Sequence, residues 1–497
     1  MKTIQISTAK TGIIYQPHWN RLITAGRAHE GMYAAWREQL IQVQREIGFE
    51  YIRFHGIFND EMMVYREDES GNAQYNWQYV DSLFDFLLSI GLRPILELGF
   101  TPTAMRSGEQ TIFWWKGNVT PPADLKKWEA LVSELVRHCI RRYGRGEVQK
   151  WYFEVWNEAN ISPFWSGTQQ DYFTLYESTA LAIKKVEKSL RVGGPATSSS
   201  DTVESPWIKD FLAFCEEKNL PLDFVSTHPY PNSYPLYSYG RPCYKDENGT
   251  YDSLVWLKKA VENTRYHDVE IHITEWNSSP NCRDLVHDTA FMAPFIVQNY
   301  IKTIGLADSI GFWTFTDIFE EESLGQSVFH GGFGMLNIQG LKKPSYHGFW
   351  FLSRLGNELL ERTDSYVITR KENRIQVLMW NYCHYNDVYA NGDPTCISQL
   401  DRYSAFAEKG DELIQIHFDK PEEKFRMIQY TFDRAHGSVF DSWLENGAPE
   451  PPDEEELQIL RTKSELESHI SYLDGADDIC IRLKPHGVTL LEFTPIK

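Results

Sequence analysis

Between residues 21 and 355 the sequence alternates eight times between a short apolar segment and a longer segment with helical periodicity. The short segments are rich in β-branched and aromatic residues, which favour strands. In one of the longer segments Leu83, Phe86, Leu87 and Ile90 recur at the spacing of an amphipathic helix. The predicted strands span residues 21–28, 49–58, 93–100, 151–158, 191–198, 223–230, 270–277 and 309–317, and each is followed by a predicted helix.

Alternation of this kind predicts an α/β protein, and eight repeats predict a (β/α)8 barrel. The alternative is an open doubly wound sheet, which normally carries a glycine-rich phosphate-binding turn after its first strand. The corresponding segment, residues 26–31, lacks that glycine spacing. We therefore expect the barrel.

The pattern changes after residue 360 to short strands separated by polar connectors, which predicts an accessory antiparallel β-sandwich packed against the barrel. We divide the chain into a barrel at residues 15–360 and a sandwich at residues 361–497, with residues 1–14 returning to pair with the sandwich. Within the second region we expect brief helices at residues 443–446 and 464–468. The acidic run at residues 450–456 is predicted to be a solvated loop.

The overall composition excludes several classes of partner. A formal net charge of −20 argues against nucleic acid and anionic membranes, because both select for basic patches. The seven cysteines are scattered without a CxxC pair, which predicts free thiols in a reducing compartment and neither disulfides nor a zinc site. No signal peptide is recognisable at the N-terminus, and no apolar run approaches the ~18 residues of a membrane span. We expect a cytoplasmic protein.

Two of the predicted strands end in a glutamate beside a tryptophan and an asparagine. Asn157 and Glu158 close the fourth strand, and Glu275 followed by Asn277 closes the seventh. A carboxylate at the end of a buried strand lies in a low-dielectric mouth, where its pKa rises and it can donate a proton near neutral pH. The alternative is a capped strand end or a structural ion pair, but neither glutamate has an adjacent lysine or arginine. Paired carboxylates of this kind are typical of glycoside hydrolysis.

In a barrel, polar residues at the carboxyl ends of the strands converge on one mouth. Strand interiors in this chain are otherwise mostly apolar, so polar residues at the strand ends are informative as a group. The second strand supplies Arg53 and His55, and the third supplies Glu97. The sixth supplies His228 and Tyr230, and the eighth supplies the segment from Trp313 to Asp317. This convergence predicts a single site built around Glu158 and Glu275.

Six stretches carry these motifs: Arg53-Phe-His-Gly56, Trp156-Asn-Glu158, Ser226-Thr-His-Pro-Tyr230, Ile273-Thr-Glu-Trp-Asn277, Phe312-Trp-Thr-Phe-Thr-Asp-Ile-Phe-Glu-Glu321 and Phe329-His-Gly-Gly-Phe-Gly334. They resemble stretches of glycoside hydrolase family 39, particularly of its bacterial β-xylosidases. The resemblance covers the barrel and extends in order and length to the C-terminal region. Asn-Glu after the fourth strand is shared by a whole clan of barrel glycosidases, whereas the run ending at Glu321 and the stretch after it are much narrower signals. Ala159 departs from the family pattern, in which many members have proline, and we expect little effect on the chemistry.

The resemblance implies a retaining, exo-acting hydrolase that removes terminal β-D-xylose from xylo-oligosaccharides and uses no cofactor or metal. Glu275 would be the nucleophile and Glu158 the acid/base, so their surroundings must separate their pKa values. Arg53 would hold Glu275 in its charged form, and Tyr230 would hydrogen-bond one of its oxygens. Retention requires the two carboxyl groups to lie about 5–5.5 Å apart.

The family pattern also implies contacts to the sugar. Asn157 would bind the 2-hydroxyl, an interaction that strengthens toward the transition state. His55 and His228 would lie near the remaining hydroxyls. Considered without the family, each of these histidines is more often a satisfied core or loop residue.

The family pattern brings Glu320 and Glu321 to the same sugar, although an adjacent acidic pair usually faces solvent. We expect at most one of the two to enter the pocket and favour Glu321. Trp313 and Trp276 are candidates for an aromatic sugar platform, and packing in the core is an equal alternative.

The sequence leaves the identity of the substrate sugar open. The same mechanism on an α-L-arabinofuranoside, a β-glucoside or a β-galactoside is an alternative, because a sequence cannot show what fills the space of a C5-hydroxymethyl group. An α-L-iduronide is disfavoured because no cationic cluster stands near the motifs. A catalytically silent carbohydrate-binding barrel is the alternative of another class, and both glutamates in matching contexts speak against it.

The exo mode rests on the family and on long segments at residues 231–250 and 318–343, which could close one end of a groove. The resemblance to β-xylosidases also suggests a homodimer or homotetramer. We expect an oligosaccharide as the substrate and neither nucleic acid nor a membrane as a partner.

Overall fold

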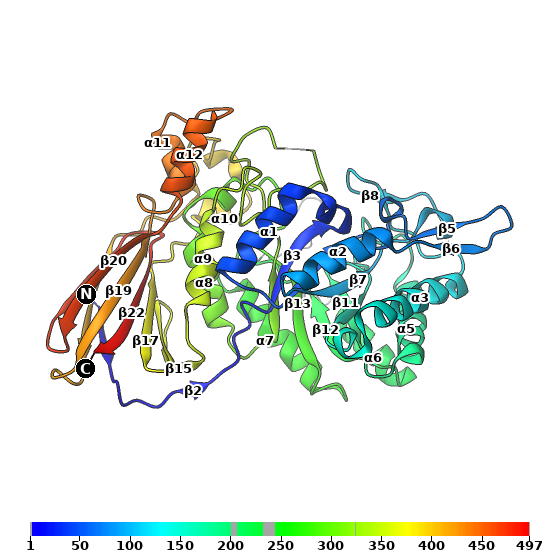
Figure 1. Cartoon of the computed structure of the whole chain (residues 1–497), viewed down its shortest axis with the longest axis horizontal. Coiled ribbons are helices and arrows are strands. Elements are labelled where there is room, and N and C mark those ends of the chain that lie inside the picture. Colours follow the sequence, from blue (N-terminus) through cyan, green and yellow to red (C-terminus); the bar gives the residue numbers. More distant parts are fainter. Residues whose placement is uncertain (1, 200–205, 232–243, 324, 497) are drawn as a thin grey trace.

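The structure is a computed structural model that describes residues 2–199, 206–231, 244–323 and 325–496. Eight parallel strands close into a barrel in which β14 pairs with β3, and helices cover its outer surface (Figure 1). This arrangement confirms the predicted (β/α)8 barrel. The barrel strands are β3 (Leu22–Arg27), β4 (Tyr51–His55), β7 (Arg93–Leu98), β10 (Tyr152–Val155), β11 (Arg191–Thr197), β12 (Phe224–Thr227), β13 (Glu270–Trp276) and β14 (Ser309–Phe312). The covering helices are α1 (Ala34–Glu46), α2 (Gln78–Ser89), α3 (Leu125–Tyr143), α5 (Gln169–Val186), α6 (Trp207–Lys218), α7 (Gly249–Glu262), α8 (Met292–Lys302) and α9 (Pro344–Ser353).

Shorter elements extend the loops between strands and helices. Two hairpins follow the carboxyl ends of β4 and β7, and a 3-10 helix follows β13. These insertions build up the side of the barrel on which the strands end. They comprise η1 (Ala28–Met32), η2 (Asp60–Met62), β5 (Tyr65–Glu67) with β6 (Ala73–Tyr75), η3 (Thr103–Met105), β8 (Thr111–Ile112) with β9 (Gly117–Asn118) and η4 (Leu285–Asp288). The short helix α4 (Arg145–Val148) instead precedes β10, at the opposite face of the barrel.

The helices begin and end where local chemistry favours it. The Asp124 side chain caps α3 by accepting the backbone N–H of Lys126 at 2.8 Å. Thr168 and Asp171 form a reciprocal capping box at the start of α5. On α3 the buried residues recur at helical spacing, so one face of the helix packs against the barrel.

Every barrel strand ends before its predicted boundary, by one residue in β3 and by five in β14. The residues beyond each strand end remain buried, which explains why their apolar pattern resembles a continued strand. They leave the hydrogen-bonded ladder and form the barrel mouth. This is the region in which the sequence places its polar motifs.

The barrel interior changes character along the strands. At the amino ends the side chains are apolar or aromatic and form a cluster of Leu22, Tyr51, Ile95, Tyr152 and Phe224. Because side chains on one face of a strand recur every second residue, the next inward positions after Tyr51, Ile95 and Tyr152 are charged. They are Arg53, Glu97 and Glu154, all of them buried. The fold thus places a charged layer directly above an apolar plug.

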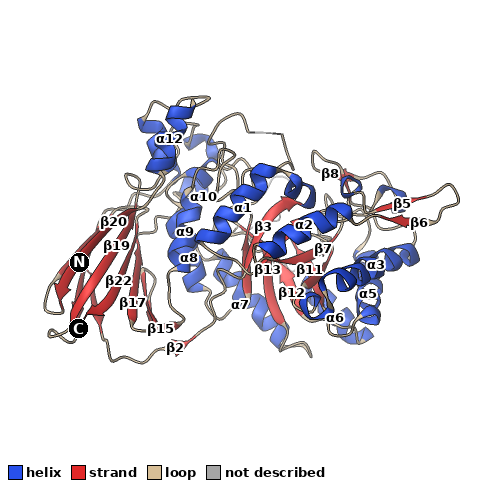
Figure 2. Ribbon diagram, in the orientation of Figure 1, coloured by secondary structure: helices blue, strands red, loops and turns tan. Residues whose placement is uncertain are grey.

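Beyond the barrel lie two further sheets with an apolar cluster between them (Figure 2). One sheet has the order β1-β18-β21 and the other the order β2-β15-β16-β17-β22-β19-β20. Their antiparallel pairs fit the predicted C-terminal β-sandwich, except that β1 runs parallel to β18. The strands are β1 (Lys2–Ile6), β2 (Ile13–Ile14), β15 (Glu358–Arg362), β16 (Tyr366–Lys371), β17 (Arg374–Trp380), β18 (Glu412–Phe418), β19 (Lys424–Phe432), β20 (Glu467–Asp474), β21 (Ile479–Leu483) and β22 (Val488–Ile496). The helices of this region are α10 (Asp387–Ala390), η5 (Pro394–Cys396), η6 (Tyr403–Ala405), α11 (Val439–Glu445) and α12 (Glu454–Lys463).

The N-terminal residues pair with both sheets, β1 with β18 and β2 with β15. The boundary predicted at residue 360 falls inside β15. The division of the chain into a barrel domain and a sandwich domain stays a prediction.

Two local predictions were wrong. The acidic run at residues 450–456 is not only a loop, because α12 begins at Glu454. Asp453 and Glu456 form a capping box, and acidic side chains in a first turn interact favourably with the helix dipole. Residues 464–468 do not form a helix, since β20 begins at Glu467 and pairs with β19. The helix predicted at residues 443–446 corresponds to the end of α11.

Three further predictions concern segments and side chains spread over the chain. The six cysteines in the described residues are all free thiols. Of the loop predicted at residues 231–250, residues 232–243 lie outside the described part of the structure. Among the described helices none combines the length and the apolar character that crossing a membrane requires.

Candidate active site

One arginine organises the centre of the barrel mouth. Arg53, on β4, is fully buried, and its Nη1 lies 2.8 Å from Glu275 Oε1. Its Nε lies 2.6 Å from Glu154 Oε2. Its Nη2 lies 2.7 Å from Asn157 Oδ1 and 3.0 Å from Glu97 Oε2. A buried guanidinium needs such partners, because an unpaired charge in the interior is strongly unfavourable. Arg53 therefore fixes side chains from β7, β10 and β13 relative to one another.

Two glutamates face each other at this mouth. Glu158 follows β10 and Glu275 lies on β13, and a carboxylate oxygen of each lies within 4.8 Å of the other. Both side chains line one cavity and are only 3% and 5% exposed. Glu158 has a left-handed backbone conformation, with φ +46°, as does Trp156 with φ +70°. Such conformations are uncommon for residues with a side chain, and here they turn the chain sharply after the strand.

The surroundings of the two carboxyl groups differ. Burial raises the pKa of Glu158 well above its ordinary value, and the negative charge of Glu275 raises it further. Burial also raises the pKa of Glu275, but the positive charge of Arg53 opposes that shift. These surroundings favour the protonated form more strongly at Glu158 than at Glu275, whose carboxylate Arg53 stabilises.

A hydrogen-bond relay fixes the tautomer of His228, which follows β12. The Thr274 hydroxyl donates to Glu154 Oε1 at 2.8 Å, so its oxygen can only accept from His228 Nε2 at 3.0 Å. Burial, with the charge of Arg53, lowers the pKa of His228 well below its ordinary value, so the ring is neutral. Nδ1 then carries no proton and can accept a hydrogen bond from the protonated carboxyl of Glu158, whose Oε1 lies 2.7 Å away. This contact favours the protonated form of Glu158.

Two more of the sequence-predicted residues contact Glu275. The Tyr230 hydroxyl donates to Glu275 Oε2 at 3.3 Å. His55 has its Nδ1 2.5 Å from Glu97 Oε2, while its Nε2 lies 3.6 Å from Glu275 and 3.5 Å from Glu321. His55 also packs against Trp313, with ring centroids 4.9 Å apart. The structure thus brings His55 from β4 and Tyr230 from the segment after β12 to one carboxylate.

The adjacent glutamates after β14 point to different surroundings. The Glu320 carboxylate pairs with Arg27 and accepts a hydrogen bond from the Tyr33 hydroxyl at 3.2 Å, and it does not line the cavity. Glu321 lines the cavity, where burial and then the charge of Glu275 raise its pKa well above the ordinary value. The pairing with Arg27 holds Glu320 to one side of the loop, and its neighbour consequently faces the site.

The cavity has a volume of about 270 Å³ and combines acidic groups with aromatic walls. Trp313 lines it, whereas Trp276 is fully buried and stacks on Phe295 with ring centroids 5.0 Å apart. Trp276 therefore belongs to the core. The lining residues are His55, Phe113, Glu158, Phe164, Tyr230, Glu275, Pro280, Asn281, Cys282, Trp313, Glu321, Glu322 and Phe333.

Several residues of this site were not predicted from the sequence. Phe113 comes from the β8–β9 hairpin, and the aromatic run Phe113-Trp-Trp115 in an otherwise polar segment was the available signal. Glu154 and Thr274 lie inside predicted strands, where a charged or hydroxyl residue among apolar neighbours could have indicated an inward polar position. The contributions of Phe164 and Cys282 have no comparable signal, because they depend on how the loops fold over the mouth.

Of the polar atoms at the mouth that have no hydrogen-bond partner within the described residues, two could bind a ligand. They are Asn157 Nδ2 and Glu321 Oε1, both buried. Buried polar atoms are usually hydrogen-bonded, so a free donor and a free acceptor here suit a hydroxylated ligand. Glu158, His228 and Glu275 also offer ligand atoms close enough together for a metal ion. The guanidinium of Arg53 opposes a second cation beside Glu275.

Comparisons with known proteins agree with this geometry. The sequence model of Glycosyl hydrolases family 39 matches residues 2–471. The chain is 37% identical to a beta-xylosidase of Caldicellulosiruptor saccharolyticus over 90% of this chain and 88% of the relative. It is 33% identical to a beta-xylosidase of Geobacillus stearothermophilus over 97% and 94% of the two chains. The crystal structure of a monomeric beta-xylosidase from Caulobacter crescentus CB15 superposes over the full length of both chains, with a TM-score of 0.90 and 28% identity.

Proposed function

We propose that this chain, which belongs to the glycosyl hydrolases of family 39, removes terminal β-D-xylose from xylo-oligosaccharides with retention of configuration. Family membership makes it a glycoside hydrolase. The relatives described as beta-xylosidases support xylose as the sugar. The observation that carries retention is the distance of at most 4.8 Å between oxygens of Glu158 and Glu275. Retaining enzymes have carboxyl groups about 5–5.5 Å apart, whereas inverting enzymes need about 6.5–9.5 Å to admit a water.

In the first step Glu275 attacks the anomeric carbon while Glu158 protonates the leaving oxygen. A bond forms between the anomeric carbon and a Glu275 oxygen, the glycosidic bond breaks, and the proton leaves with the aglycone. Arg53 and Tyr230 contact the Glu275 carboxylate and favour its ionised form. His228 accepts a hydrogen bond from protonated Glu158 and keeps the proton available at neutral pH.

In the second step Glu158 acts as a base. Once Glu275 is an ester it has no negative charge, so the repulsion that raises the pKa of Glu158 is removed. Glu158 can then take a proton from water as the water oxygen attacks the anomeric carbon. The ester bond breaks, and Glu275 leaves as the carboxylate that Arg53 stabilises.

The remaining contacts of the sugar are proposed from polar groups in or next to the cavity that have no hydrogen-bond partner. Asn157 Oδ1 is bound to Arg53, which leaves Nδ2 to donate to the 2-hydroxyl. Glu321 Oε1 and His55 Nε2 face the cavity and suit other hydroxyls. Trp313 provides an apolar surface for the sugar ring. Glu320 contributes only by its pairing with Arg27.

We expect nitrophenyl β-D-xyloside to give the highest kcat/KM in a panel that includes the α-L-arabinofuranoside, β-glucoside and β-galactoside. Phe113, Phe164 and Phe333 crowd the cavity, so a C5-hydroxymethyl group must find room against packed rings. One additional group in such a pocket changes discrimination by roughly 10- to 200-fold. Initial rates across the panel measure this ratio.

The Glu275→Ala variant, purified in parallel, is the control for contaminating glycosidases. A higher kcat/KM on another glycoside would replace xylose by that sugar. Absence of turnover on every member of the panel would contradict the proposal as a whole.

A further inference from the structure

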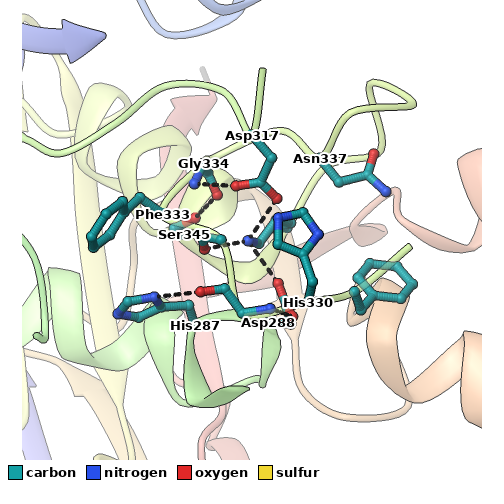
Figure 3. A network of polar contacts seen from close by, with 12 residues as sticks. His287, Asp288, Asp317, His330, Phe333, Gly334, Asn337 and Ser345 are labelled. Carbon is teal, nitrogen blue, oxygen red and sulfur yellow. Dashed lines mark hydrogen bonds and ion pairs between the residues drawn. The ribbon is translucent and has the colours of Figure 1, made fainter. Parts of the chain in front are cut away.

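A fully buried lysine ends the loop that follows β14. Lys343 precedes α9, and its ammonium contacts Asp288 Oδ1 at 2.6 Å, Asp317 Oδ2 at 3.1 Å and the carbonyl oxygen of Gly332 at 2.7 Å (Figure 3). The ammonium group donates hydrogen bonds to Asp317 Oδ2 and to the Gly332 carbonyl, and its contact with Asp288 Oδ1 is an ion pair. The catalytic steps described above make no use of this cluster.

The two aspartates extend the cluster to the backbone. Asp317 Oδ1 accepts the N–H of Gly334 at 2.6 Å, and Asp288 Oδ2 accepts the N–H of Gly331 at 2.7 Å. Figure 3 shows Asp288 and Asp317 pointing toward the same nitrogen. A Cβ atom on Gly332 would lie 2.3 Å from Asp317 Oδ1, so only glycine permits this approach.

The bound backbone groups surround one residue of the cavity wall. The Gly332 carbonyl immediately precedes Phe333 and the Gly334 N–H immediately follows it, so the cluster holds the chain on both sides of this residue. The Phe333 side chain lines the cavity that contains Glu275 and packs edge-on against Phe319 at 5.5 Å. The position of the ammonium group therefore determines where this wall stands.

The cluster is balanced in charge. Arg402, from the segment between β17 and β18, has its Nη1 2.7 Å from Asp288 Oδ2 and donates from Nη2 to the carbonyl of Phe329 at 2.6 Å. Burial alone would raise the pKa of Asp288, but the positive charges of Lys343 and Arg402 hold this pKa below its ordinary value. Without Lys343, the buried carboxylate of Asp317 would lose the cation with which it pairs and Asp288 would keep Arg402, an arrangement that favours displacement of the loop.

We propose that Lys343, together with Asp288 and Asp317, forms a buried clamp that positions Phe333 against the bound sugar. Lys343 is then a positioning residue for glycoside turnover and acts through Phe333. The inference rests on the proposed function only for its substrate. The competing explanation is that the clamp stabilises the fold without affecting the geometry of the cavity.

Lys343→Met removes the charge and keeps most of the side-chain length. We expect kcat/KM for nitrophenyl β-D-xyloside to fall about 10- to 100-fold, mainly through KM, because a wall displaced by an ångström misplaces the sugar. Lys342→Met is the matched control. Lys342 pairs with Glu46 at 3.0 Å and Glu465 at 2.7 Å, away from the cavity, and its loss should leave kcat/KM within about twofold.

A double-mutant cycle with Phe333→Ala separates positioning from stability. In the Phe333→Ala background, Lys343→Met should lower kcat/KM by less than about threefold, because coupled residues act non-additively. Amide exchange of the peptide covering residues 328–336 should be faster in Lys343→Met and unchanged in Lys342→Met. If Lys343→Met does not fold, Asp317→Asn takes its place with the same expected non-additivity, since it retains an acceptor for the Gly334 N–H.

The clamp proposal is contradicted if folded Lys343→Met keeps the kcat/KM of the wild type. It is also contradicted if Lys343→Met lowers kcat/KM by the same factor with and without the Phe333 ring. An inactive wild-type enzyme would count against the proposed function and not against the clamp. In that case amide exchange decides: equal exchange of residues 328–336 in the Lys343→Met and Lys342→Met variants would overturn it.

Discussion

Replacement of Glu275 by alanine is expected to lower kcat for nitrophenyl β-D-xyloside by roughly 10⁴-fold or more, as loss of one member of a covalent catalytic unit does. Without the carboxylate no glycosyl ester can form, and Arg53 faces one acidic partner fewer. The remaining carboxylates, Glu154 and Glu97, still neutralise the arginine, so the fold should persist. Steady-state rates with circular dichroism of the same preparation test both statements.

Azide distinguishes loss of a nucleophile from loss of structure. Sodium azide should restore turnover of Glu275→Ala by attacking from the vacated face, and the product should be the α-xylosyl azide of inverted configuration. Glu270→Gln, at the opposite end of β13, is the matched control and should need no azide. Failure of azide to act on a folded Glu275→Ala enzyme would contradict the nucleophile assignment.

Replacement of Glu158 by alanine is expected to lower kcat/KM according to the leaving group. Proton donation contributes roughly 10²- to 10⁴-fold, so xylosides with poor leaving groups should lose about that factor. Strongly acidic leaving groups depart without protonation, so kcat/KM for substrates that carry them should fall far less. The slope of log kcat/KM against leaving-group pKa, measured over a series of aryl xylosides, should therefore become much steeper in the variant.

The pH dependence gives the same residue a second test. Because burial and the charge of Glu275 raise the pKa of Glu158, wild-type activity should be lost as pH rises through that pKa and the proton departs. This alkaline limb should be absent from kcat/KM of Glu158→Ala with activated substrates. An equal loss on good and poor leaving groups, or an unchanged alkaline limb, would contradict the acid role.

The barrel could be predicted because its information is local and repeated. Each strand carries its own apolar pattern, and parallel strands end at the same face, so the sequence predicts Glu158 and Glu275 at one mouth. The same argument placed Arg53, His228 and Tyr230 there. Strand ends were predicted too late because residues such as Asn157 stay buried after leaving the ladder.

The remainder depends on contacts between distant segments. The orientation of Glu320 is decided by Arg27, almost the whole barrel away in sequence, and no local pattern distinguishes it from Glu321. The relay from Glu154 through Thr274 to His228 joins three strands, and the clamp around Lys343 joins two loops. The helix α12 was missed for a different reason, because its acidic first turn has the composition of a solvated loop.

The most direct test of the central claim is the configuration of the first sugar released. Proton NMR during hydrolysis of a β-xyloside by the wild-type enzyme, at enzyme concentrations high enough to outrun mutarotation, should show β-xylose before α-xylose. That order follows from two displacements at one carbon by the closely spaced Glu275 and Glu158. Appearance of α-xylose first would require a single displacement by water and would contradict the account.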